Sequence, residues 1–249
     1  MAQPKVGLQL IVYGRRPGED LEGVLKEVAG AGYVGIEAGN LYAMAGEDVV
    51  EDILAETGLE VAGMHSGYNE TTNTAKVEAN LEYLQTVGAG YLINSGVAPG
   101  EGLEAYEAAA ETFNRVGQSC LDAGIVFAYH NHNWEFKEFD GVKGMHRLCE
   151  LTDPELVKLC VDVYWVHIGG EDPAEFIARY SDRAEYFHVK DGSPGKFIEL
   201  GEGEVDLKSA LAAARKQNPE WIVCEQDRSD LEPKESITRS MAYLKTIGL

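Results

Sequence analysis

The chain is short of basic residues and of cysteine, and both shortages limit what it can be. Its 249 residues include 21 Lys or Arg against 42 Asp or Glu, for a formal net charge of −21. Neutralising nucleic-acid phosphates requires clustered cations, and no basic run occurs, so no nucleic acid is expected as a partner. The four cysteines lack CxxC or other zinc-type spacing, and we interpret them as buried, reduced thiols of a cytoplasmic protein.

Several other familiar signals are missing. No apolar run approaches the ~20 residues of a membrane span and no signal-peptide pattern opens the chain, so no membrane is expected as a partner. The turn from Ile11 to Gly18 contains neither GxGxxG nor a P-loop, which disfavours a nucleotide-binding doubly wound sheet. No linker or break in composition divides residues 1–249, and we expect a single domain.

Short apolar runs alternate with longer amphipathic ones along the whole chain. The apolar runs are Val6–Val12, Val34–Glu37, Leu59–His65, Gly90–Asn94, Gly124–His130, Val157–Val163, Glu185–Val189 and Trp221–Glu225. The helix-like stretches are Leu21–Ala31, Asp48–Thr57, Thr74–Val87, Gly102–Ala123, Gly144–Leu151, Pro173–Tyr180, Leu207–Lys216 and Lys234–Leu244. Apolar strands separated by helices are typical of a parallel sheet, and the length is near the ~250 residues of an eightfold barrel. The expected fold is therefore an α/β (β/α)8 TIM barrel.

Each of the last four predicted strands ends near a residue that can bind a metal. These residues are His130, Asp162, His188 and Glu225. Parallel strand ends converge at one mouth of a barrel, so two imidazoles and two carboxylates predict a divalent-metal site there. His132 shares a strand face with His130, and the sequence leaves open which imidazole is the ligand. Asp162 could instead be a helix N-cap, and Glu225 a salt-bridge partner at the rim.

Three further polar residues end predicted strands. Glu37 closes the second strand and His65 the third, and either could bind substrate or transfer protons. Lys190 shares a strand face with His188 and could stabilise a developing oxyanion.

Some polar residues are expected to be structural. Asp191 has the opposite parity to Lys190 and is interpreted as a loop cap or structural partner. Asp172 and Asp206 have N-cap character, the latter delivered by the turn Gly201-Glu202-Gly203. We place His146 in a helix and His167 in a loop after a strand, with no functional role.

The motifs at these strand ends resemble those of the xylose-isomerase-like TIM-barrel superfamily. The resemblance runs over nearly the whole chain, and within the superfamily it is to the sugar phosphate isomerase/epimerase group, whose relatives include inosose dehydratases and ketose epimerases. The motifs are Tyr129–Phe136 (YHNHNWEF), Val161–Val166 (VDVYWV), Phe187–Asp191 (FHVKD), the Gly201–Gly203 turn and Val223–Asp227 (VCEQD).

By position, the resemblance implies the metal ligands His130, Asp162, His188 and Glu225. One departure stands out. Ketose epimerases of the superfamily carry a glutamate at the strand-five position, where this chain has His130. That difference puts their two-glutamate mechanism in doubt.

The resemblance further implies a sugar or keto-sugar substrate and a divalent ion, with Mn²⁺, Co²⁺, Mg²⁺ and Zn²⁺ all suited to mixed nitrogen and oxygen ligands. The expected reaction is proton abstraction next to a carbonyl through an enediolate, as in a sugar isomerase or epimerase. Glu37, His65 or Glu225 would transfer the proton, and Lys190 would support the oxyanion.

His132 and Trp165 are expected to contact the substrate, Trp165 by packing on a sugar face. A metal-dependent lyase or dehydratase acting on a keto-sugar, inosose or 3-keto-glycoside is the alternative activity, and a metal-free sugar-binding relative is a further one. A homo-oligomer is compatible with the family, in which dimers and tetramers occur, and most soluble oligomers are symmetric assemblies of one chain.

Overall fold

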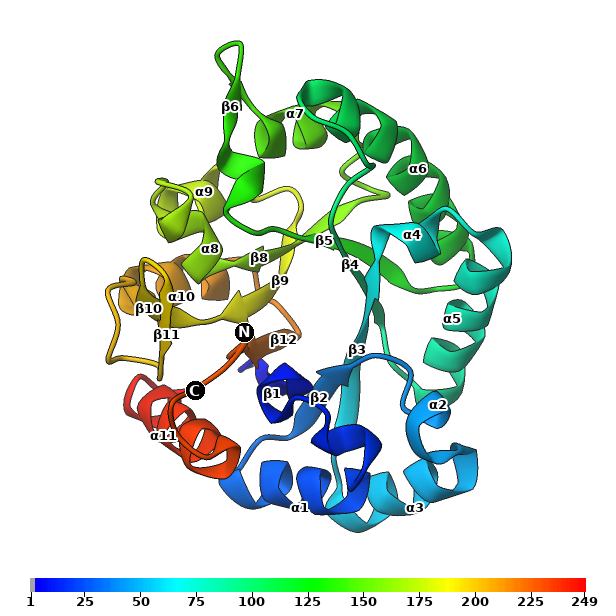
Figure 1. Ribbon diagram of the computed structural model, residues 1–249, viewed down its shortest axis with the longest axis vertical. Helices are drawn as coiled ribbons and strands as arrows, with labels where there is room; N and C mark the ends of the chain where they lie inside the picture. Colours follow the sequence, from blue (N-terminus) through cyan, green and yellow to red (C-terminus); the bar gives the residue numbers. More distant parts are fainter. Residues whose placement is uncertain (1–2) are drawn as a thin grey trace.

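Eight parallel strands close into a barrel in the order β1-β12-β9-β8-β5-β4-β3-β2 (Figure 1). The computed structural model describes residues 3–249. The strands are β1 (Lys5–Gln9), β2 (Gly35–Ala38), β3 (Glu60–Gly67), β4 (Tyr91–Ser95), β5 (Val126–His130), β8 (Lys158–Asp162), β9 (Ala184–Val189) and β12 (Trp221–Cys224). The predicted (β/α)8 barrel is confirmed.

A ring of helices surrounds the barrel, and each predicted helix is present to within two residues at either end. They are α1 (Leu21–Ala31), α3 (Glu47–Thr57), α5 (Thr74–Val87), α6 (Leu103–Asp122), α7 (Gly144–Leu151), α9 (Pro173–Arg179), α10 (Leu207–Lys216) and α11 (Pro233–Thr246). The N-cap predictions are confirmed, because Asp172 accepts the Glu175 N–H and Asp206 accepts the Ser209 N–H.

Smaller elements lie in the loops between the barrel strands and the helices that follow them, and they were not predicted. They are η1 (Leu10–Tyr13), η2 (Arg16–Gly18), α2 (Tyr42–Ala45), α4 (Tyr68–Thr71), η3 (Trp134–Phe136), α8 (Val163–Ile168) and the hairpins β6–β7 (Glu138–Phe139, Val142–Lys143) and β10–β11 (Asp191–Ser193, Lys196–Ile198). They are short and follow the strands directly, so no long periodic pattern marks them in the sequence.

The predicted strand boundaries lie within two residues of the observed ones, except for the end of the first strand. That strand ends at Gln9 and not at Val12, because the Gln9 side chain accepts the Ile11 N–H and turns the chain into η1. The sixth strand ends at Asp162, which caps α8 through its side chain. As a result, His167 lies in helix α8 and not in a loop.

The interior of the barrel is layered. Apolar side chains fill its lower part, including Tyr91, Ile93, Ala128, Cys160 and Val223. The inward positions nearest the carboxyl ends of the strands are polar instead. All four cysteines are buried and none forms a disulfide, as predicted. Within residues 3–249, no helix has the length and apolar character needed to span a membrane.

Candidate metal centre

The four predicted ligands meet at the mouth of the barrel. One ligand atom from each of His130, Asp162, His188 and Glu225 lies within 4.8 Å of the others. All four side chains are buried, and Glu225 is the most exposed at 5%. The cluster contains His130 and leaves His132 outside it. The geometry thus favours His130 over His132 as the strand-five ligand.

Unpartnered atoms at this cluster fit a cation. Asp162 Oδ2, His188 Nδ1 and Glu225 Oε2 are buried and have no hydrogen-bond partner of good geometry. They still lie within ion-pair distance of charged neighbours, His188 Nδ1 facing Glu225 Oε2 and Asp162 Oδ2 facing Lys190. Buried polar atoms usually have a partner, and nitrogen and oxygen donors converging on one point suit a divalent ion.

Asp162 serves two purposes with its two oxygens. Oδ1 accepts the Trp165 N–H at 2.9 Å and so caps α8. The neighbouring strand holds its backbone in place, because the Asn131 amide accepts the Asp162 N–H and donates to the Asp162 carbonyl. Burial raises the pKa of Asp162 to about 6, although Lys190 pulls in the opposite direction. The N-cap interpretation is confirmed, and Oδ2 faces the Lys190 ammonium at the predicted cation site.

His188 is held between two carboxylates. Its Nε2–H donates to Glu37 Oε2 at 2.7 Å, while Nδ1 faces Glu225. Tyr186 donates to the same Glu37 oxygen at 2.9 Å. Burial alone would raise the pKa of Glu37, but His188 and His65 lower it to about 2. A charged Glu37 therefore fixes the ring of His188 and leaves Nδ1 for a metal, a common outer partnership of metal-binding histidines.

His65 lies beside this cluster and is more exposed than His130 and His188. Its Nδ1–H donates to Glu37 Oε1 at 3.2 Å, and its Nε2 accepts the Ser95 hydroxyl at 2.9 Å. The side chain is 21% exposed, whereas that of Glu37 is fully buried. Both residues predicted at the ends of strands two and three thus lie beside the predicted ligands, in one hydrogen-bonded chain.

Lys190 lies among acidic groups at the same level. Its Nζ is 2.5 Å from Glu225 Oε1, 2.6 Å from Asp227 Oδ2 and 3.1 Å from Asp162 Oδ2. Burial would lower the pKa of Lys190, but the three carboxylates raise it, so the ammonium is charged. Glu225 is consequently the salt-bridge partner of Lys190, and its second oxygen faces His188.

The local charge is negative. Four carboxylates (Glu37, Asp162, Glu225 and Asp227) lie here with one ammonium, that of Lys190, which contacts the last three. Three negative charges therefore remain when the imidazoles are neutral, as metal binding requires. A divalent ion would offset two of them. Buried charges without compensation are costly, which is a second reason why these side chains fit a metal.

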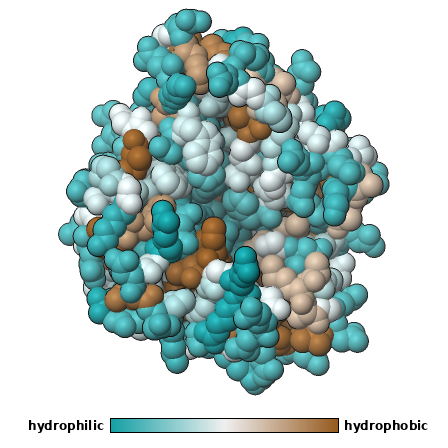
Figure 2. Space-filling view, in the orientation of Figure 1, coloured by the Kyte–Doolittle hydropathy of each residue, from teal (hydrophilic) through white to brown (hydrophobic). Residues whose placement is uncertain are grey.

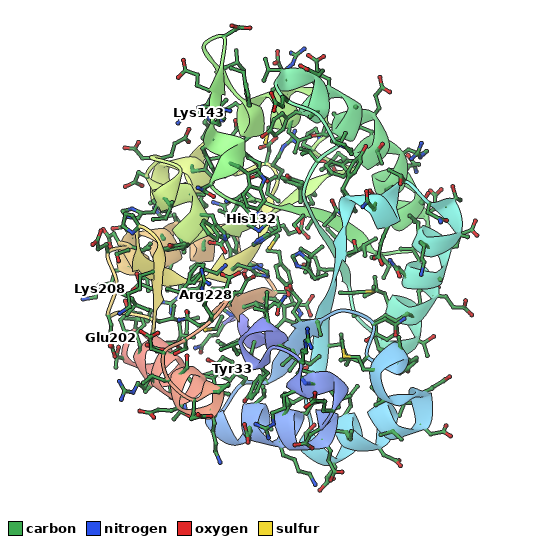
Figure 3. All side chains as sticks on the ribbon, viewed as in Figure 1. Tyr33, His132, Lys143, Glu202, Lys208 and Arg228 are labelled. Carbon is green, nitrogen blue, oxygen red and sulfur yellow. The ribbon has the colours of Figure 1, made fainter. Side chains whose placement is uncertain are left out.

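An aromatic wall borders the site. The rings of His132 and Trp134 stack with centroids 3.9 Å apart, and Trp165 lies 5.6 Å from His132. Lys190 Nζ lies 5.2 Å from the Trp165 ring and 5.6 Å from the Phe197 ring. Figure 3 shows His132 beside the central opening of the barrel. Burial lowers the pKa of His132 to about 3, so its imidazole is neutral at physiological pH.

A buried carboxylate lies behind this wall. Glu135 accepts the Tyr129 hydroxyl at 2.7 Å and the His132 backbone N–H at 2.9 Å. Burial raises the pKa of Glu135 to about 7 despite these donors. Glu135 therefore fixes the turn that presents His132.

Asp191 is structural, as predicted. Its carboxylate accepts backbone N–H groups from Gly192, Gly201, Gly203 and Val205. These four bonds tie the Gly201–Gly203 turn to the β10–β11 hairpin, which carries Phe197. The turn is architectural, and it positions an aromatic ring over Lys190.

The opposite side of the mouth is less polar. A hollow of about 240 Å³ is lined by the loops after β1 and β2, including Leu10, Ile11 and Met44. Figure 2 shows the centre of this face hollowed, with hydrophobic residues beside the opening.

Sequence reasoning missed several neighbours of the site. Ser95 ends the fourth strand, Tyr186 precedes His188 by two residues, and Asp227 follows Glu225 by two. The period of two within a strand could have flagged Tyr186. Phe197 lies in an unpredicted hairpin, and no sequence signal points to it.

Comparisons with known proteins agree with this fold. Residues 25–247 match the family model described as xylose isomerase-like TIM barrel. The chain belongs to this family. An inosose dehydratase of Geobacillus kaustophilus is 30% identical over 211 residues, which span 76% of this chain and 67% of the relative.

Two solved structures share the fold. One is a sugar phosphate isomerase/epimerase from Parabacteroides distasonis, with a TM-score of 0.84, 24% identity, and coverage of 98% of this chain and 94% of the other. The second is a 3-keto-D-glucoside 4-epimerase from E. coli, with a TM-score of 0.75, 18% identity, and coverage of 98% and 100%. These two likenesses concern the fold, whereas the likeness in sequence is to an inosose dehydratase.

Proposed function

We propose that the protein is a divalent-metal-dependent sugar isomerase or epimerase that removes a proton next to the carbonyl of a keto-sugar. The observation that carries this proposal is the convergence of four buried ligand-type atoms within 4.8 Å, at the mouth of the barrel. The names of the relatives and neighbours support a small sugar or keto-sugar as the substrate.

His130, Asp162, His188 and Glu225 would hold the ion, with Glu37 orienting His188. When bound, a divalent ion supplies a Lewis acid that polarises a substrate carbonyl. Mn²⁺, Co²⁺, Mg²⁺ and Zn²⁺ all accept this ligand set.

His65 is the proposed base. Glu37 holds its Nδ1–H, which leaves the Nε2 lone pair facing Ser95 and the opening. When substrate displaces the Ser95 hydroxyl, Nε2 takes the proton on the carbon next to the carbonyl, leaving an enediolate. The carboxylate of Glu37 then stabilises the imidazolium that forms, as in other carboxylate–imidazole pairs.

His132 is placed to bind the substrate, since its neutral imidazole offers one N–H donor and one lone pair. The His130 ring lies 5.4 Å from that of His65 and 4.7 Å from that of His132, so the two outer imidazoles flank a proposed ligand. Isomerisation needs only one base, which takes the proton from one carbon and returns it to the next, and His65 meets that need. Lys190 would balance the developing negative charge.

Trp165 and the stacked His132–Trp134 pair form the aromatic surface on which a sugar ring would lie. Aromatic rings offer a large apolar face to the C–H side of a sugar.

Elimination is the second candidate. The same enediolate would expel a hydroxyl or glycosyl oxygen from the neighbouring carbon, giving a dehydratase or lyase. The specific observation in its favour is the 30% identity to an inosose dehydratase, together with a histidine where ketose epimerases of the superfamily carry a glutamate.

Manganese-loaded protein should be incubated with ketoses, inososes and 3-keto-glycosides in deuterated water and followed by NMR. An isomerase or epimerase gives a saturated isomer that carries solvent deuterium, whereas elimination gives an unsaturated, ultraviolet-absorbing product. A His65→Gln variant should retain the metal and lose the exchange. Metal-loaded protein that exchanges no proton in any of these substrates would contradict the proposal.

A further inference from the structure

The barrel interior places a thiol beside two of the proposed ligands. Cys160 is fully buried, and its Sγ lies 3.8 Å from His130 Nδ1. One ligand atom from each of His130, Cys160 and His188 lies within 4.8 Å of the others. These three residues form a cluster of two nitrogens and one sulfur.

The strand register explains why the thiol lies there. Cys160 on β8 pairs with His130 on β5, so the two side chains point to the same side of the sheet. Cys160 also precedes Asp162 by two residues, and alternation along a strand turns both into the barrel. Its other neighbours in the interior include Ala128 and Val223, which offer no oxygen ligand.

The two clusters differ in the ions that they suit. Asp162 and Glu225 supply hard oxygen donors near the mouth. Cys160 supplies a soft sulfur donor among apolar side chains, and thiolates select soft ions. Both clusters require the same pair of imidazoles, since each contains His130 and His188.

We propose that His130, Cys160 and His188 form a second metal site that binds thiophilic ions such as Cd²⁺ and Cu⁺. Coordination makes a sulfur–metal bond and releases the thiol proton to solvent. An ion held there uses both shared imidazoles, so it excludes a hard ion from the carboxylate site and stops metal-dependent turnover. This proposal goes beyond the proposed function, because it requires only the three side chains and no particular reaction.

Titration of the metal-free full-length protein with cadmium chloride tests the site. The expected result is one Cd²⁺ per chain and an ultraviolet sulfur-to-cadmium charge-transfer band. In a second titration, of protein first loaded with Mn²⁺, the bound Mn²⁺ should be released as the band grows. A Cys160→Ser variant should lose the band and bind Cd²⁺ at least about tenfold more weakly, while it still binds Mn²⁺. Cys224→Ser is the matched control, since Cys224 is equally buried on β12, two strands away, but packs in the core outside the barrel.

A second variant separates this site from the proposed function. Asp162→Asn should bind Mn²⁺ poorly and keep the cadmium band, so the thiol site stands even if the metal-dependent reaction is never found. The inference is overturned if Cys160→Ser keeps the band or wild-type cadmium affinity, or if Mn²⁺ and Cd²⁺ bind together at two ions per chain. Should the serine variant not fold, absence of the band from the wild-type protein decides against the site.

Discussion

The four ligand-type side chains lie at or next to the carboxyl ends of strands β5, β8, β9 and β12, whereas none of the four comes from strands β1 to β4. The first group holds buried carboxylates and imidazoles that converge within 4.8 Å. The second group provides Glu37 and His65, which contact the cluster through hydrogen bonds, and an apolar hollow of about 240 Å³. Under the proposed function, one half of the mouth would hold a cation, and the other would orient a ligand of that cation, move protons and accommodate the rest of the substrate.

Removing a ligand tests the cation-holding half and should have the largest effect. In Glu225→Ala we expect loss of the bound metal and a fall in turnover of about 10³-fold or more, because the Lewis acid contributes several kcal/mol. Turnover and metal content should be measured on the same sample. Activity lost with full metal retention would show that Glu225 acts only on protons.

His65→Ala tests the other half. We expect kcat to fall by about 10²–10⁴-fold, the usual contribution of a general base, while the metal content stays at the wild-type level. This is the reverse of the pattern expected for a ligand variant. Metal loss equal to that of Glu225→Ala would contradict the proposed division, because His65 would then also be needed to hold the ion.

Glu37→Gln probes the link between the halves. The amide oxygen can still accept from His188, but it carries no charge, so we expect metal affinity to fall by about 10–100-fold. Isothermal titration with Mn²⁺ measures this directly. An unchanged affinity would mean that His188 does not need the Glu37 carboxylate.

The smallest effect is expected from a change at Glu135, which lies behind the aromatic wall. Burial raises the pKa of Glu135 to about 7, above its ordinary value of 4.5, so the folded protein holds this proton more tightly than the unfolded chain. Its contribution to stability is therefore present at low pH and is lost as pH rises from 4.5 through 7. Glu135→Gln should raise the free energy of unfolding at pH 8 by about 1–3 kcal/mol and change it little at pH 4.5.

Urea unfolding of both proteins at the two pH values checks this prediction. A difference between variant and wild type that is the same at pH 4.5 and pH 8 would show that Glu135 does not titrate on unfolding.

Much of the barrel could be predicted from the sequence, because each strand and helix has its own periodicity and some helices begin at a capping aspartate such as Asp172 or Asp206. The end of β1 and the start of α8 could not, since both depend on one side chain, Gln9 or Asp162, turning the backbone. The convergence of strand ends followed from the fold itself. The hydrogen-bonded chain from Ser95 to His188 did not, because it depends on rotamers and on how far the strands are staggered.

Elemental analysis of purified wild-type, Glu225→Ala and His65→Ala proteins tests the four proposed strand-end ligands most directly. We predict near-stoichiometric Mn, Co, Mg or Zn in the wild type and in His65→Ala, and almost none in a folded Glu225→Ala, as expected of a metal site built from these side chains. A wild-type protein that neither retains nor takes up a divalent ion, or a Glu225→Ala variant with full metal content, would contradict this prediction.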